Sequence, residues 1–266
     1  MIEFDKGPLQ PFARIFAACP DYGELKRHFW YDWGPIFHRG RTDGSARVLC
    51  IASDPGATER IAARTLVGDA GQRVQGFLAK LGLTRSYLLL NAFSYALIPS
   101  QASQGDNVLA QPEQVAWRNR LLNLALASET QAIVAFGAQA RRAVDLWPGK
   151  GDTPVIEVPH PSSRDEGVLL ERWREAVVQL RALVTPDDDG DPGLPNYGQS
   201  FRESDYAPVP ARDLPFGVPP FLGNDAWGRA RSPPRRGSVT RPRPDDRHTL
   251  VWVAPDPDAP ETGDGR

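Results

Sequence analysis

Four short apolar runs, each flanked by turn residues, constrain the fold of this 266-residue chain more than any other feature. They are ARVLCIAS (46–53), SYLLLNAF (86–93), QAIVAFG (131–137) and TPVIEVPH (153–160). Runs this short and this apolar are typical of strands that are buried on both faces, as in parallel sheets. They therefore predict a sheet of four parallel strands at the centre of the protein.

Amphipathic helical patterns separate and follow these runs. The segment DAGQRVQGFLAKLG (69–82) repeats apolar residues on one helical face, and Pro112 is well placed to open a second helix. A third helix is expected over 137–147, and a fourth from the apolar stripe Leu169, Trp173, Ala176, Val177, Leu180 and Val184. Strands that alternate with helices predict an α/β fold, a three-layer sandwich around a central four-stranded parallel sheet.

From Thr185 onward the composition changes. Of the 26 prolines, 15 lie after this point, and stretches such as PDDDGDPGLPNYG bury too little apolar surface to offset the entropy lost on ordering. The island HTLVWVAP (248–255) has the composition of a strand. We therefore expect an α/β domain over residues 1–184 and a Pro-rich C-terminal extension over 185–266 that is partly extended or disordered.

Composition excludes several classes of protein. The net charge of −2 gives no broad cationic face, so any nucleic-acid contacts must be few and well placed. No apolar stretch approaches the roughly 20 residues that a membrane span needs. The N-terminal segment lacks a secretory pattern, and two cysteines, Cys19 and Cys50, cannot supply a disulfide framework or a typical iron–sulfur cluster. We expect a cytoplasmic, monomeric protein that uses no metal or other cofactor.

Polar side chains follow three of the four predicted strands. Asp54 follows the first strand, Asn91 ends the second, and His160 ends the fourth. Because ligands bind beyond the carboxyl ends of parallel strands, these three residues are expected on one rim of the sheet. Each alone has a structural explanation: a turn that caps a helix, an amide bonded to a loop, or a satisfied core histidine. At equivalent strand ends they together indicate an active site.

These residues carry a resemblance to the uracil-DNA glycosylase superfamily. ASDPG (52–56) resembles its water-activating loop, LLLNAF (88–93) its uracil-reading strand, and HPSS (160–163) the start of its minor-groove loop. Two further segments, 65–85 and 135–140, also resemble family motifs. The resemblance covers roughly residues 45–184, with the motifs in the family order, and the C-terminal extension lies outside it.

The resemblance implies a base-excision DNA repair enzyme. Such an enzyme hydrolyses the N-glycosidic bond of a uracil flipped out of single- or double-stranded DNA, leaving an abasic site and releasing free uracil. The cluster cysteines of the iron–sulfur branch are absent, so the chain resembles a branch without that cluster. Ser53 stands where the iron–sulfur branch has a glutamate, so the water-activating role falls on Asp54.

The resemblance also implies residue roles. Asp54 would orient water and stabilise the sugar cation, and a neutral, donating His160 would stabilise charge on uracil O2. Asn91 would donate to uracil O4 and accept from N3–H. The other base-binding residues implied are Ser53, Pro55, Gly56, Leu66 and Phe93. The implied DNA-binding residues are Gly68, Gly71, Pro161, Ser162, Ser163 and Arg164.

Three alternatives remain open. Gly56 stands where one branch has a tyrosine that blocks the thymine methyl, so a G·T/U mismatch-type glycosylase of broader base range is possible. A catalytically silent DNA-damage-binding module on the same fold is the second, although Asp54 and His160 argue against it. A flavodoxin-like nucleotide enzyme would need a glycine-rich phosphate loop, and SDPGATER has a single glycine. Because every assigned residue precedes Thr185, the extension is expected to be dispensable for the chemical step.

Overall fold

The computed structural model describes residues 3–216, 218, 238–240 and 251–253. Among these residues, five strands form the main sheet in the order β1-β3-β2-β4-β5. The strands are β1 (His38–Gly40), β2 (Val48–Ala52), β3 (Tyr87–Asn91), β4 (Ala132–Phe136) and β5 (Val155–Val158). The last four are parallel, as predicted. The sequence analysis did not predict β1, a three-residue strand that pairs antiparallel with β3 at one edge.

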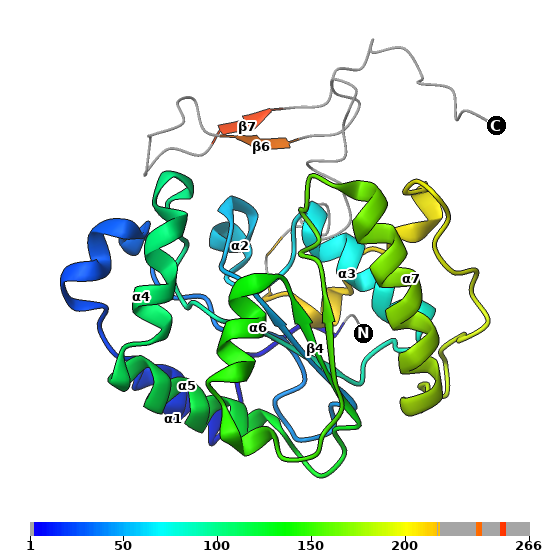
Figure 1. Ribbon diagram of the computed structural model, residues 1–266, viewed down its shortest axis with the longest axis horizontal. Coiled ribbons are helices and arrows are strands. Elements are labelled where there is room, and N and C mark those ends of the chain that lie inside the picture. The colour runs from blue at the N-terminus through cyan, green and yellow to red at the C-terminus, as the bar shows by residue number, and fades with distance from the viewer. Residues whose placement is uncertain (1–2, 217, 219–237, 241–250, 254–266) are drawn as a thin grey trace.

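Helices cover both faces of this sheet (Figure 1). The α-helices are α1 (Phe12–Ala17), α2 (Ala57–Ala62), α3 (Asp69–Lys80), α4 (Gly105–Leu109), α5 (Pro112–Ala125), α6 (Ala138–Asp145) and α7 (Glu166–Leu183). Short 3-10 helices are η1 (Gly23–His28), η2 (Tyr31–Trp33), η3 (Pro99–Gln104), η4 (Pro148–Lys150), η5 (Glu203–Asp205) and η6 (Ala211–Asp213). All four predicted helices are present as α3, α5, α6 and α7.

Two apolar layers hold the sandwich together, because alternate residues of each buried strand face opposite sides of the sheet. Val48 and Cys50 of β2 pack with α3 and α7, whereas Leu49 and Ile51 pack with α1, α5 and α6. All five residues of β2 are buried, which explains why its sequence shows no alternation of polar and apolar residues. The predicted three-layer α/β sandwich is therefore confirmed.

Residues 186–216, here called the strap, pack on the domain through turns and the short helices η5 and η6, and contribute buried acids to it. Asp187 accepts hydrogen bonds from the backbone N–H groups of residues 84–86. Asp205 and Asp213, both buried, pair with Lys80 (2.8 Å) and Arg39 (3.0 Å). Lys80 and Arg39 are themselves buried, so these strap carboxylates neutralise cations inside the domain. The boundary at residue 184 stays a prediction.

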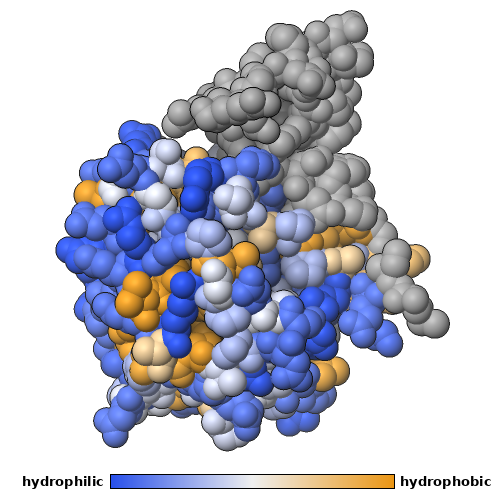
Figure 2. Space-filling view, turned by 90° about the vertical axis from the view of Figure 1, so that its right-hand side faces the viewer, coloured by the Kyte–Doolittle hydropathy of each residue, from blue (hydrophilic) through white to orange (hydrophobic). Residues whose placement is uncertain are grey.

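The side of the molecule that carries α7 and the strap is mostly hydrophilic, with separate apolar patches (Figure 2). Exposed large apolar side chains of α7 and the strap are Val168, Val178, Leu183, Leu194 and Phe216. No helix in the described ranges is long and apolar enough to cross a membrane. Beyond the strap, β6 (Ser238–Thr240) and β7 (Val251–Val253) pair antiparallel. β7 falls within the predicted strand 248–255, the rest of which lies outside the described residues.

We predict that a chain ending after residue 218 keeps most of the stability of the full chain, whereas one ending after residue 184 does not. Removing one partner of a buried ion pair typically costs about 3–5 kcal/mol, and the shorter chain loses the partners of both Arg39 and Lys80. Urea unfolding followed by circular dichroism measures the difference.

A matched pair of substitutions in the full chain separates this effect from chain length. Asp205→Asn should destabilise the protein strongly, whereas Asp189→Asn, which removes an exposed partner of Arg85, should leave the unfolding midpoint nearly unchanged. Equal unfolding midpoints for the chains ending at 184 and 218 would contradict the structural role of the strap.

Candidate active site

The carboxyl ends of the parallel strands bring the three predicted polar residues to one rim. Ala52 of β2 lies in register with Asn91 of β3, so Asp54 continues beside Asn91. On the other side of β2, Phe136 of β4 is in register with Val158 of β5, so Gly137 and His160 continue together. A Cβ atom at Gly137 would come within 3.0 Å of the His160 Cβ, which shows how closely this backbone approaches the imidazole.

A pocket of about 490 Å³ opens at this rim, within the range of roughly 300–1,000 Å³ that is usual for small-molecule sites. Four of its lining residues were predicted from sequence: Ser53, Asp54, His160 and Ser162. The other four were missed: Leu97, Pro99, Ala102 and Gln139. Three of these missed residues belong to the loop and 3-10 helix that follow β3, where the sequence carries no chemical signal.

The carboxylate of Asp54 is held at both oxygens. Its Oδ2 accepts a hydrogen bond from the Leu97 backbone N–H (2.9 Å), and its Oδ1 accepts one from the Ser53 hydroxyl (2.8 Å). Burial raises the pKa of Asp54 from 3.8 to about 6, against the opposing effect of these two hydrogen bonds. The carboxyl group is therefore ionised at neutral pH but protonated in mild acid.

His160 is held as a neutral ring with a defined tautomer. The Ser162 backbone N–H donates to Nδ1 (3.2 Å), so Nδ1 is an acceptor and the proton of the neutral ring lies on Nε2. Burial lowers the pKa of His160 to about 4, which keeps the ring uncharged at neutral pH. The geometry thus provides a neutral Nε2–H donor, the form that the sequence analysis required of His160.

Asn91 carries an unsatisfied amide. Its Oδ1 and Nδ2 atoms are both buried, and neither has a hydrogen-bond partner among the described residues. A buried polar group without a partner costs about 1–3 kcal/mol, so the arrangement suits a ligand that offers one donor and one acceptor. Asn91 sits at the end of β3, next to the pocket, although it does not itself line the pocket.

Glu59 joins two loops of the site and was missed by the sequence analysis. Its Oε2 accepts from the Gly56 N–H (2.9 Å), and its Oε1 accepts from the N–H groups of Val67 (2.8 Å) and Gly68 (3.1 Å). The side chain is buried. One carboxylate therefore ties the loop that carries Asp54 to the start of α3, and its only sequence signal is a Glu three residues after a helix N-cap.

Several other predicted site residues are buried in the fold. Leu66 packs in the layer beneath α3, and Phe93 packs against Phe29 in an aromatic cluster. Gly68 and Gly71 are also buried, and a Cβ atom at Gly71 would overlap the Leu66 carbonyl. None of these residues lines the pocket, so the structure gives them packing contacts, and their base or DNA contacts stay predictions.

The remaining predicted residues lie at the surface or at its edge. Gly56, Ser162 and Arg164 are exposed, and Ser163 is half-buried with its backbone N–H bonded to the His160 carbonyl (2.8 Å). The two prolines of the motifs, Pro55 and Pro161, are buried. Of these residues only Ser162 lines the pocket, and Arg164 is exposed two residues further along the same loop.

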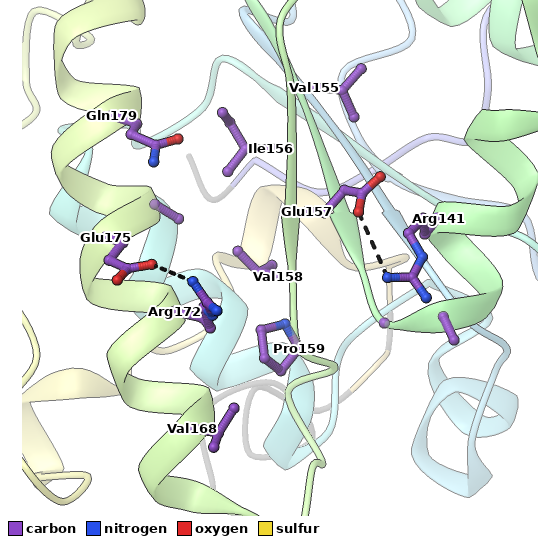
Figure 3. A pocket seen from close by; sticks show the side chains of 13 residues that line it. Arg141, Val155, Ile156, Glu157, Val158, Pro159, Val168, Arg172, Glu175 and Gln179 are labelled. Carbon is purple, nitrogen blue, oxygen red and sulfur yellow. Dashed lines mark hydrogen bonds and ion pairs between the residues drawn. The ribbon is translucent and has the colours of Figure 1, made fainter.

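A second pocket, of about 520 Å³, follows the outer edge of β5 between α6 and α7 (Figure 3). Its charged side chains pair with one another at the surface, Arg141 with Glu157 (3.8 Å) and Arg172 with Glu175 (3.0 Å). The rim pocket, by contrast, is lined by Asp54 and His160, the carboxyl and imidazole groups whose pKa values burial shifts. We therefore assign the chemistry to the pocket at the rim.

Comparison with known proteins identifies the family. The model of the uracil DNA glycosylase superfamily matches residues 39–176, just over half of the chain, so the chain belongs to this superfamily. No curated protein sequence matches the chain at a significant level. Membership supports a glycosylase function in base-excision repair of DNA. In the described part of the chain, no three His, Cys, Asp or Glu side chains group as metal ligands would.

We predict that NMR titration of the free protein will place the carboxyl midpoint of Asp54 near pH 6 and keep His160 neutral down to about pH 4. Because the folded-state pKa of Asp54 exceeds 3.8, its ionisation lowers folding stability as the pH rises from about 4 to about 6. Glu59→Gln should lower the Asp54 midpoint, since it removes a nearby negative charge.

Glu175→Gln, a change of the same type at an exposed site on α7, serves as the control and should leave the Asp54 midpoint unchanged. An Asp54 midpoint below pH 4 in the native protein would show that its carboxyl group is solvated and the assignment wrong.

Proposed function

We propose that the protein is a monofunctional uracil-DNA glycosylase, which hydrolyses the N-glycosidic bond of a flipped-out uracil and leaves an abasic site. The observation that carries this proposal is the buried amide of Asn91, which has no partner in the described chain. Uracil offers an O4 acceptor next to an N3–H donor, and the amide has the matching donor and acceptor. Cytosine presents the opposite pair, so the same amide would reject it.

Departure of the base leaves negative charge on the uracil ring. A neutral His160 with its proton on Nε2 is suited to donate to uracil O2, and this hydrogen bond strengthens as charge develops. The Ser162 N–H bond to Nδ1 fixes the ring before substrate binds. The role of His160 is therefore electrostatic stabilisation of the leaving group by a neutral donor.

Loss of the base anion leaves a sugar with cationic character, which water then attacks. The anion of Asp54 would stabilise this cation and orient the water. Each carboxylate oxygen already accepts one hydrogen bond from Leu97 or Ser53, and each retains a second lone pair for water. Since burial raises the pKa of Asp54 to about 6, the rate of the chemical step is expected to fall below that pH.

DNA binding by this chain would depend on placed contacts, because its net charge is only −2. Ser162, which lines the pocket, and Arg164, exposed two residues further on, offer a hydroxyl and a guanidinium that are suited to phosphate oxygens. Flipping the uracil costs a few kcal/mol, which is lowest in single strands and mismatches. We therefore expect the enzyme to prefer uracil in single-stranded or mismatched DNA over uracil in fully paired DNA.

Single-turnover excision from uracil-containing oligonucleotides, single-stranded and paired, tests the proposal by alkaline cleavage of the abasic product. We predict that Asp54→Ala and His160→Ala each lower the rate by about 10²–10³, the usual cost of one electrostatic group, while Glu175→Gln leaves it unchanged. Near-native rates in both pocket variants would refute the site, and tight binding without excision would identify a damage-binding module instead.

The same assay with T·G duplexes tests the mismatch-type alternative. Gly56 is exposed and has no side chain that could block a thymine methyl, which favours this alternative. One methyl group changes the binding free energy by only about 1–3 kcal/mol, so the absence of a blocking side chain at residue 56 does not by itself make thymine a good substrate. We expect uracil to be preferred by more than about tenfold over thymine, or roughly 1.4 kcal/mol.

Asn91→Asp should shift base choice towards cytosine, because a carboxylate can accept from the cytosine amino group. The wrong pairing is worth roughly 1–3 kcal/mol per bidentate contact, by analogy with groove readout. Competition between uracil and cytosine oligonucleotides measures the change. A variant that still excises uracil at the native rate would show that Asn91 does not read the base.

A further inference from the structure

The backbone on both sides of His160 is held by side chains from two helices. The Pro159 carbonyl accepts a hydrogen bond from the indole N–H of Trp173 on α7 (3.0 Å). The Pro161 carbonyl accepts one from Nη1 of Arg73 on α3 (2.9 Å). Because proline has no N–H group, a carbonyl is the only backbone hydrogen-bonding group that either neighbour of His160 offers. Arg73 and Trp173 therefore fix the loop at the two points next to the imidazole.

The guanidinium of Arg73 is enclosed by groups of the protein. Its Cζ lies 4.4 Å from the ring centre of Phe201 and 5.5 Å from that of Tyr206. Its Nε lies 3.2 Å from the Tyr206 hydroxyl and 3.3 Å from Oδ2 of Asp69. A planar guanidinium that stacks on two rings and bonds along its edge is pre-organised. These contacts indicate that Arg73 holds the loop and is not a ligand-binding residue.

Trp173 packs against the same part of the strap. Its indole is fully buried and meets the ring of Tyr197 at 5.6 Å and that of Phe201 at 6.1 Å, both edge to face. Phe201 therefore contacts both of the side chains that hold the His160 loop. Its backbone N–H also bonds to Glu166 at the start of α7 (3.2 Å), which fixes this part of the strap against the helix.

We infer that strap residues 197–206 are part of the machinery that positions His160, acting through Arg73 and Trp173 as positioning residues. This segment lies outside residues 39–176, which the superfamily model matches. The inference departs from the expectation, drawn from sequence alone, that everything after residue 184 is dispensable for the chemical step. Its catalytic consequence rests on the proposed function, in which His160 donates to the leaving base.

A double-mutant cycle tests the positioning role. Arg73→Met keeps an unbranched stem against the two rings and removes the donors, and a displacement of about 1 Å in an active site can cost about 10²-fold in rate. We expect a loss of about 10- to 100-fold in single-turnover excision. Arg172→Met, which removes an exposed guanidinium from α7, is the matched control and should stay within about twofold of the native rate.

In a His160→Ala background the effect of Arg73→Met should shrink to less than about threefold, because the positioned group is gone. A full loss in both backgrounds would show that Arg73 acts on the fold in general, and would overturn the inference. Phe201→Leu should give the same non-additive pattern. If melting shows that this variant is unfolded, Tyr206→Phe takes its place, because it removes only the hydroxyl next to Arg73.

The ¹⁵N resonances of the His160 ring provide a readout that needs no activity. The native ring should show a protonated Nε2 and a bare Nδ1, whereas Arg73→Met should shift both resonances towards a mixture of tautomers. An unchanged spectrum in Arg73→Met would overturn the inference whatever the rate. If the native protein excises no uracil, the proposed function fails, while the spectra still decide whether Arg73 positions the ring.

Discussion

The architecture of the site depends on one constraint, the cost of polar groups at the ends of strands that are buried on both faces. Each such group must form a hydrogen bond within the protein or remain available to bond a ligand. Here the backbone satisfies Asp54 through Leu97 and His160 through Ser162. The Asn91 amide is left unsatisfied. The fold thus holds the Asp54 carboxylate and the His160 ring in place and leaves the Asn91 amide able to bond a ligand.

The same constraint links the site to parts of the chain that are distant in sequence. Glu59 satisfies three backbone N–H groups where two loops meet, and Arg73 satisfies the carbonyl that follows His160. The surroundings of Arg73 in turn include rings from the strap. Asp54, Glu59 and Arg73 thus belong to hydrogen-bonded contacts that join the pocket to neighbouring loops and helices.

Much of the fold, and the meeting of three polar residues at one rim of the sheet, could be predicted from sequence because the signals are local. Buried strands show as apolar runs, and strand ends bring Asp54, Asn91 and His160 to one rim whatever the rest of the chain does. β1 escaped prediction because the three residues His38–Gly40 contain no apolar run and pair through their backbone. Glu59 and Arg73 escaped because their roles depend on contacts between segments, which no spacing along the chain reveals.

The placement of the strap acids bears on how segments of this chain can be exchanged between relatives. Arg39 and Lys80 lie inside the region that the superfamily model matches, and their counter-charges, Asp213 and Asp205, lie outside it. A chimera cut at the limits of that region would bring two buried cations into a host without their anions. The segment that recombines intact is therefore longer than the segment that defines the family, and it ends after Asp213.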